Sequence, residues 1–191
     1  FKSRGNWATH NGNYRGNWSP YIPRNIILRY SKENDLVLDY FCGAGTTGIE
    51  SKLLHRNFIG LDINSKAIEL AKNNLDFDSY SLFENFKSKI GLRIGDARNL
   101  QHVDNDSIDL ICAHPPYANI IHYTDENPSD LSNYQATEFL EQVEKVAAES
   151  YRVLKNNRFC AILIGDMRKN KNVIPLGFWT IQKFLDARFR L

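Results

Sequence analysis

The chain has 191 residues, of which 42% are hydrophobic and 24% are charged. This composition is typical of a soluble globular protein with enough apolar material for one domain core. The 24 Lys and Arg residues against 22 Asp and Glu residues give a net charge of +2, too balanced to indicate a nucleic-acid partner through bulk charge. Apolar stretches are short, and no charged-then-apolar leader opens the chain. We therefore expect no membrane span and no secretory signal, and a cytoplasmic protein.

The cysteines and the single methionine carry separate expectations. Cys42, Cys112 and Cys160 are an odd set without a CxxC pair, and each has apolar neighbours. This is typical of reduced, buried residues, so we predict neither a disulfide nor a metal site. The chain begins at Phe1 and its only methionine is Met167, so we expect the numbered chain to be a piece of a longer protein.

Residues 1–19 show no periodicity and predict an irregular arm, after which helical and strand patterns alternate. In chain order the predicted elements are a helix at Tyr21–Ser31, a strand at Leu36–Phe41, a helix at Thr46–Leu54, a strand at Asn57–Leu61, a helix at Ser65–Leu75, a weak helix over about 80–88, strands at Ile90–Ile94 and Ile108–Ala113, a helix at Thr137–Leu154, a strand at Arg158–Ile164 and a helix at Leu176–Arg188. This alternation predicts an α/β fold with a mostly parallel sheet and helices on both faces. Ligands of such folds bind at the carboxyl ends of the strands.

The first predicted strand ends in a glycine-rich turn. The run from Gly43 to Gly48 matches GxGxxG, and Asp62, about 20 residues on, can accept hydrogen bonds from both ribose hydroxyls. The pattern alone fits a nicotinamide dinucleotide or S-adenosylmethionine. Asp39, shortly before Gly43, suits a ligand with a positive amino group and would repel a pyrophosphate. Asp96, at another strand end, can accept from an adenine amino group.

A second turn, His114-Pro115-Pro116-Tyr117, follows the predicted strand Ile108–Ala113. The two prolines stiffen it and remove two N–H donors, which leaves carbonyl acceptors and presents Tyr117 for stacking. An exocyclic amine on a base is a weak nucleophile, because its lone pair is delocalised into the ring. Acceptors on its hydrogens, here the Pro115 carbonyl and the His114 imidazole, favour the pyramidal geometry that frees the lone pair. The base must be extruded to reach such a pocket.

Four segments together resemble the amino-group DNA methyltransferases, which methylate cytosine at N4 or adenine at N6. They are Leu36–Ser51, Ile59–Asn64, Gly95–Arg98 and His114–Tyr117, within a resemblance that runs from about Pro20 to Gly177. It implies a Rossmann-like class I methyltransferase fold over residues 20–191, without the family's last strand pair. The implied activity is site-specific methyl transfer from S-adenosylmethionine to a flipped base of DNA, as in restriction-modification systems.

The resemblance also implies roles for single residues. The catalytic turn is His114, Pro115, Pro116 and Tyr117, and no metal takes part. The implied cofactor-binding residues are Pro23, Asp39, Phe41, Gly43, Gly45, Thr46, Thr47, Asp62, Ile63, Asp96 and Ala97. Of these, Asp62 is assigned to the ribose, Asp96 to the adenine, and Pro23 to the segment near the methionine end. The loop after the catalytic turn is expected to contact the substrate through Asn119, His122 and Tyr123.

Two departures from the family pattern leave questions open. The residue before Pro-Pro-Tyr is usually Ser in cytosine enzymes and Asp or Asn in adenine enzymes, so His114 does not indicate the base. Since an imidazole accepts only when unprotonated, activity is expected to fall as the pH drops through the His114 pKa, normally near ~6.5. A separate target-recognition region is missing, so recognition falls to the arm, to the loop 118–135, to another segment or to a partner subunit.

Several alternatives remain. Trp7, Tyr14 and Trp18 of the arm either stack on bases or seal the edge of the core, while His10 and His55 are interpreted as ordinary surface or core histidines. RNA guanine-N2 methyltransferases share a similar glycine turn and an Asp-Pro-Pro-Tyr turn, so RNA is a second candidate substrate. A nicotinamide dehydrogenase and a non-catalytic binding module are the other hypotheses.

Overall fold

The computed structural model describes residues 5–14, 16–78, 87–117, 129–169 and 171–191. Within them, five strands form one sheet in the order β3-β2-β1-β4-β5. All four neighbouring pairs are parallel. The strands are β1 (Leu36–Asp39), β2 (Asn57–Asp62), β3 (Ile90–Ile94), β4 (Ile108–Ala113) and β5 (Leu154–Ile162). The predicted α/β fold with a mostly parallel sheet is confirmed.

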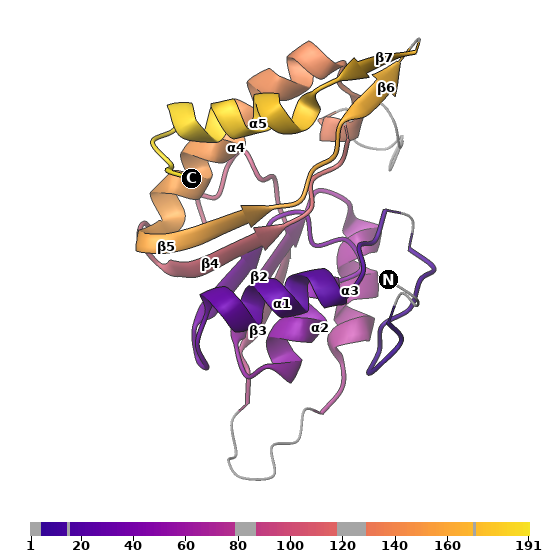
Figure 1. Ribbon diagram of the computed structural model, residues 1–191. Coiled ribbons are helices and arrows are strands. Elements are labelled where there is room, and N and C mark those ends of the chain that lie inside the picture. The colour runs from indigo at the N-terminus through magenta and orange to yellow at the C-terminus, as the bar shows by residue number, and fades with distance from the viewer. Residues whose placement is uncertain (1–4, 15, 79–86, 118–128, 170) are drawn as a thin grey trace.

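Helices cover both faces of this sheet (Figure 1). Those on one face are α1 (Tyr21–Tyr30), α2 (Thr46–Leu53) and α3 (Ser65–Leu75), and those on the other are α4 (Ala136–Val153) and α5 (Leu176–Asp186). Two of the helices start at recognisable caps. The Asn64 side chain accepts from the Lys66 backbone N–H at 3.0 Å, and Gln135 and Glu138 form a capping box at the start of α4.

Each face of the sheet has its own core because the central strands are apolar on both sides. On the α1–α3 face, Phe58 of β2 packs with Ile27 and Ile49, all at 1% exposure or less. On the opposite face, Ile111 of β4 packs with Phe139 of α4, and both are fully buried. The continuous apolar run of β4 therefore matches a strand covered from both sides.

The last part of the sheet differs from the prediction in two ways. β5 begins at Leu154, directly after α4, and its register against β4 shifts between Ile108 and Leu110. Asn157 has φ +58°, a left-handed conformation that asparagine tolerates and that departs from the extended strand. The part of β5 before Arg158 was therefore not predicted from the sequence pattern. A hairpin of β6 (Met167–Lys169) and β7 (Asn172–Ile174) was also not predicted, since these strands are too short to show alternation. Most of the predicted helix at 80–88 lies outside the described residues.

The prediction of free, buried cysteines is confirmed in part. All three cysteines are free, with Cys42 and Cys112 buried, but Cys160 is only partly buried, contrary to the prediction. Among the described residues, no cluster of His, Cys, Asp or Glu side chains is arranged to hold a metal ion. No helix within the described ranges has the length and apolarity needed to cross a membrane.

The order of the strands determines where a ligand site is expected in this sheet. The chain runs outward from β1 through β2 to β3 on one side, and then returns to add β4 and β5 on the other. The switch point therefore lies between β1 and β4, where connections leave the sheet in opposite directions and a crevice opens at the carboxyl ends. The Gly43 turn follows β1 and the His114 turn follows β4, so both predicted turns lie beside this crevice.

Close packing of α2 on β2 makes Gly48 a test of the fold. A Cβ atom at Gly48 would lie 2.6 Å from Cε1 of the buried Phe58 ring, whereas at Gly91 the nearest atom would be 3.9 Å away. We expect Gly48→Ala to lower the free energy of unfolding by ~1–3 kcal/mol through overpacking. Gly91→Ala is the matched control and should change it by less than ~0.5 kcal/mol. Equal unfolding midpoints in urea for both variants would contradict the packing described.

Candidate active site

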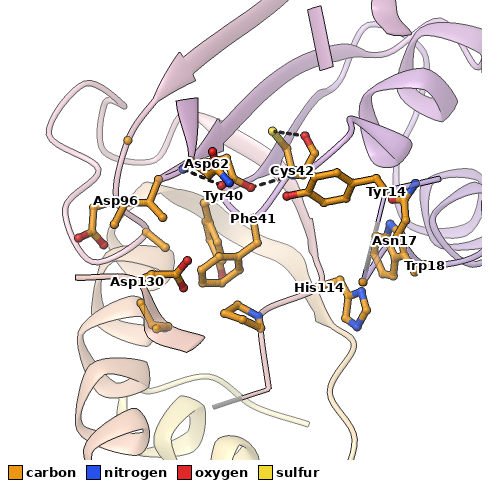
Figure 2. Close-up of a pocket in the computed structure, with 18 residues that line it drawn as sticks. Tyr14, Asn17, Trp18, Tyr40, Phe41, Cys42, Asp62, Asp96, His114 and Asp130 are labelled. Carbon is orange, nitrogen blue, oxygen red and sulfur yellow. Dashed lines mark hydrogen bonds between the residues drawn. The ribbon is translucent and has the colours of Figure 1, made fainter. Parts of the chain in front are cut away.

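A cavity opens at the switch point and encloses about 710 Å³, including its open mouth (Figure 2). Residues of both predicted turns line this cavity. The predicted site residues that line it are Phe41, Gly43, Asp62, Ile63, Asp96, Ala97, His114 and Pro116. Those that do not are Pro23, Asp39, Gly45, Thr46, Thr47, Pro115 and Tyr117. Asn119, His122 and Tyr123 lie outside the described residues.

The bend between β1 and α2 requires glycine at two positions. Gly43 has φ +49° and Gly45 has φ +84°, a region that residues with a Cβ rarely adopt. At Gly43 a Cβ would also lie 3.0 Å from the ring of Tyr14. The backbone at Gly43 can therefore border the cavity without a side chain between it and a ligand.

Asp39 lies behind this bend. The side chain is 2% exposed, and its two oxygens accept from the Phe41 backbone N–H at 3.0 Å and the Thr47 hydroxyl at 2.6 Å. Burial raises the pKa of Asp39 to about 7, against the lowering effect of these hydrogen bonds. The carboxyl therefore supports the bend from inside instead of facing the cavity, where the sequence argument had placed it opposite an amino group.

Asp62 closes the bend from the other side. At the end of β2 it accepts from the Gly43 N–H and the Asn64 N–H, both at 2.9 Å, and it lines the cavity. Burial raises its pKa to about 6. A carboxylate oxygen has a second lone pair, so each oxygen can still accept a hydroxyl of a ligand.

Asp96 is engaged by Arg98. The Arg98 guanidinium and backbone N–H make four contacts of 2.6–3.1 Å to the two Asp96 oxygens. Arg98 also donates to Gln142 at 3.0 Å and to the Ser129 carbonyl at 2.7 Å. The hydrogen bonds to Asp96 raise the Arg98 pKa further. This side chain thereby ties the end of β3 to the segment after residue 128.

His114 is held between two aromatic rings. Its imidazole stacks on Trp18, with ring centroids 5.4 Å apart and 22° between planes, and its Nε2 lies 2.8 Å from the Tyr117 hydroxyl. Burial lowers the His114 pKa to about 4. The imidazole is therefore neutral near pH 7. The His114 pKa that was expected near ~6.5 is therefore corrected to about 4.

The N-terminal arm forms one wall of the cavity. Tyr14, Gly16, Asn17 and Trp18 line it, and the Thr46 hydroxyl donates to the Asn17 side chain at 2.6 Å. Trp18 is 6% exposed and belongs to the core on the α1–α3 face. The arm aromatics were expected either to stack on bases or to seal the edge of the core, and the burial of Trp18 supports the second role.

A buried carboxylate anchors this arm. Glu50 of α2 is fully buried and accepts from Trp7 Nε1 at 2.7 Å and from Arg24 Nη1 at 2.9 Å, and it lies 2.7 Å from His10 Nε2. The sequence analysis missed both Glu50 and the role of His10. The available signal was an acidic residue in the stretch Thr46–Ser51, where every other residue is small or apolar.

The cavity is acidic. Carboxylates of Asp62, Asp96 and Asp130 line it, and none of the described residues in its lining is Lys or Arg. Asp130 is 4% exposed and belongs to the loop after the catalytic turn, which the sequence analysis expected to contact the substrate. Such a lining fits a ligand that carries positive charge and disfavours a pyrophosphate, which argues against a nicotinamide dinucleotide.

Comparison with known proteins agrees with this geometry. Residues 1–73 match the DNA methylase family. The type II methyltransferase M2.LlaDCHI of Lactococcus lactis subsp. cremoris is 48% identical over 56 residues, 29% of this chain and 21% of that protein. A tRNA (guanine(10)-N2)-dimethyltransferase of Methanothermobacter thermautotrophicus is 33% identical over 105 residues, 54% of this chain and 29% of that protein.

The fold also has solved counterparts. A TehB-like S-adenosylmethionine-dependent methyltransferase from Corynebacterium glutamicum superposes with a TM-score of 0.56 at 17% identity, covering 94% of this chain and 75% of that one. The chain therefore has the Rossmann-like fold of S-adenosylmethionine-dependent methyltransferases. The matches to the first curated type II methyltransferase relatives span only 21–22% of their length.

The Trp18 stack is expected to control the His114 pKa. Trp18→Ala opens the imidazole to water and should move its pKa from about 4 toward ~6.5, whereas Trp18→Phe keeps a ring in place and should not. The unfolded chain takes up this proton near ~6.5 and the folded chain only near 4. Folding stability should therefore fall as the pH drops from about 6.5 to about 4. A titration of ¹⁵N-labelled histidine by NMR measures the pKa in each protein, and urea unfolding across this pH range measures the stability. A wild-type His114 that titrates near ~6.5 would contradict the burial.

Proposed function

We propose that this chain forms the cofactor-binding and catalytic part of a DNA methyltransferase that modifies an exocyclic amino group of an extruded base, cytosine N4 or adenine N6. The observation that carries this proposal is that the Gly43 turn and the His114 turn line one cavity. A transfer reaction needs donor and acceptor within bonding distance, and positioning of this kind supplies much of the rate acceleration. The DNA methylase match over residues 1–73 supports DNA as the substrate.

The cavity fits S-adenosylmethionine as the cofactor. Asp62 is suited to its ribose hydroxyls, the acidic lining suits its positive charge, and the bare backbone at Gly43 allows close approach. When bound, this cofactor supplies a methyl group already activated on a positively charged sulfur. The protein therefore needs no strong base to activate the donor, and its residues act on the acceptor amine.

The His114 turn supplies the acceptors for that amine. The Pro115 carbonyl oxygen is an acceptor, and a neutral imidazole has one acceptor nitrogen. When Nε2 carries the proton it donates to the Tyr117 hydroxyl, 2.8 Å away, and Nδ1 becomes the acceptor. Burial favours the neutral imidazole that this role needs.

Base binding falls to the Tyr117 ring, next to His114 in the same turn. An extruded base has two π faces and stacks on an aromatic ring whatever its identity. Readout of the target sequence is assigned to a separate segment or subunit, or to the residues around 118–128. The base itself, cytosine or adenine, follows from neither turn.

RNA is the second candidate substrate. The tRNA (guanine(10)-N2)-dimethyltransferase relative aligns over 105 residues, more of this chain than the segment shared with M2.LlaDCHI. Its reaction also methylates an exocyclic amine of a base, so the same turns would suffice. DNA is preferred because the family match and several relatives are DNA-modifying proteins.

A methyl-transfer assay tests the proposal directly. The chain is incubated with S-adenosylmethionine labelled on the methyl group and with unmethylated DNA or bulk tRNA, and the product is digested to nucleosides for mass spectrometry. We expect N4-methylcytosine or N6-methyladenine from the DNA. N2-methylguanine in tRNA without label in DNA would establish the RNA alternative, and cofactor binding without transfer to either would indicate a non-catalytic module.

Tyr117 separates stacking from hydrogen bonding. Tyr117→Ala removes the ring and should weaken binding of a DNA with a pre-flipped or mismatched target base by ~1–3 kcal/mol. Tyr117→Phe keeps the ring and removes only the hydroxyl that contacts His114, so binding should stay close to wild type. Fluorescence anisotropy with labelled duplexes gives the Kd values. Equal losses in both variants would assign the effect to the hydroxyl and contradict the stacking role.

A further inference from the structure

The β6–β7 hairpin carries two basic side chains that are open to a partner. Arg168 of β6 and Lys171 of the turn are exposed, and neither side chain makes an ion pair or a hydrogen bond with any of the described residues. Arg98, at the same edge of the sheet, is instead bound by Asp96. Two positive charges on one short hairpin favour an anionic ligand.

The buried side of the hairpin fixes the direction of Arg168. Met167 is 4% exposed and packs with Ile174 in the core on the α4–α5 face. The register pairs Met167 with Ile174 and Arg168 with Val173. Because successive residues of a strand point to opposite faces, Arg168 and Val173 lie on the outer face, where Val173 is 54% exposed. The hairpin is thus anchored on one side and presents a guanidinium on the other.

Lys171 occupies a position that favours glycine. The register pairs Lys169 with Asn172, so Lys171 lies in the turn between them, and it has φ +65°. Tight hairpin turns favour glycine at such positions, because a Cβ atom crowds the backbone in the left-handed region. Folding therefore gives no reason for a lysine here. Strain that is kept in a backbone points to a function of the residue, and this side chain adds a positive charge.

The hairpin begins beside the catalytic turn. β4 and β5 stay paired to their ends, where the Leu163 N–H donates to the Ala113 carbonyl at 3.1 Å. The two chains therefore leave the sheet together, one toward His114 and the other toward β6 (Figure 1). A Cβ atom at Gly165 would lie 4.0 Å from the Tyr117 hydroxyl. The segment before β6 thus passes next to the residue proposed to stack on the base.

Chain geometry limits how far the basic groups lie from this point. Arg168 follows Gly165 by three residues and Lys171 follows it by six, so their Cα atoms lie within about 11 Å and about 22 Å of Gly165. A DNA strand rises ~3.4 Å per nucleotide. Both side chains are therefore expected to reach phosphates within a few nucleotides of a base held in the cavity. Phosphates at this place need neutralisation, because the carboxylates of the cavity repel them.

We propose that the β6–β7 hairpin binds the phosphate backbone of DNA beside the extruded base, through Arg168 and Lys171. The proposal rests on the proposed function, since it takes DNA as the substrate, and it adds a binding surface outside the two turns. Phosphate contacts fix the position of a protein on the duplex and carry no sequence information directly. The hairpin therefore holds the target strand over the cavity, and readout of the sequence stays with another segment or subunit.

The salt dependence of DNA binding tests the proposal. The full chain is titrated by fluorescence anisotropy with a labelled duplex that carries one mismatched base as an easily extruded target. Each phosphate contact contributes about 0.9 to the slope of log K against log salt, and so about eightfold in affinity at about 0.1 M salt. We expect Arg168→Gln combined with Lys171→Gln to lower the affinity about 60-fold and the slope by about 1.8. Lys32→Gln changes an exposed lysine before β1, at the opposite edge of the sheet, and is the matched control that should alter neither.

Lys171→Gly separates the charge from the structure of the turn. Glycine relieves the strain at this position, so the unfolding midpoint in urea should not fall, whereas the affinity for DNA should fall about eightfold at about 0.1 M salt. A lower midpoint with unchanged affinity for DNA would assign Lys171 to the turn and overturn its role in binding.

Neutral methylphosphonates in the duplex locate the contact and separate the possible failures. A substitution at the phosphate that Arg168 contacts, within about three nucleotides of the mismatch, should weaken wild-type binding and leave that of Arg168→Gln unchanged. Equal affinity and equal slope for wild type and the double variant would overturn the hairpin proposal and leave the proposed function standing. If the wild-type chain binds no DNA even at low salt, the proposed function fails instead.

Discussion

The bend between β1 and α2 depends on two carboxylates, the buried Asp39 and the partly buried Asp62, that hold it from opposite sides. Asp39 accepts from the Phe41 N–H and the Thr47 hydroxyl on the inner side, and Asp62 accepts from the Gly43 N–H on the cavity side. A bend with two residues at positive φ has few backbone hydrogen bonds of its own, so side chains must supply them. The open backbone at Gly43, and with it the cavity, exists because these bonds are made.

The N-terminal arm forms one wall of the cavity and contacts both turns. Tyr14 lies against Gly43, and Trp18 stacks on His114, so one short segment contacts both the proposed cofactor turn and the catalytic turn. Glu50 anchors the start of this segment through Trp7, and an uncompensated carboxylate at this depth would be costly. A change in the arm is therefore expected to reach both halves of the proposed reaction, which explains why an irregular segment is so thoroughly fixed.

How much of this the sequence could predict depends on the range of the interaction. Most of the strands and helices were predictable because they have an apolar pattern of their own, which β6 and β7 are too short to show. The strand ends were predictable because Asp62 and His114 follow those patterns directly. The arm was not, since Trp18 has no periodic neighbours and its partner His114 lies almost a hundred positions away. The Arg98 contacts could not be predicted for the same reason, since Gln142 is 44 positions from Arg98 in the sequence. Local patterns locate a site along the chain, whereas its walls come from contacts between distant segments.

An acidic cavity raises an electrostatic problem for a protein proposed to act on DNA, which carries a charge at every phosphate. The balance of the whole chain, +2, offers little attraction to offset it. For the proposed reaction, the acidity of the cavity would select what enters it. The carboxylates of Asp62, Asp96 and Asp130 would attract a cationic cofactor and repel phosphates, and they would not repel a neutral base. The same carboxylates that favour the cofactor thus restrict the nucleic acid to an extruded base, which is the only form in which its amine can reach the His114 turn.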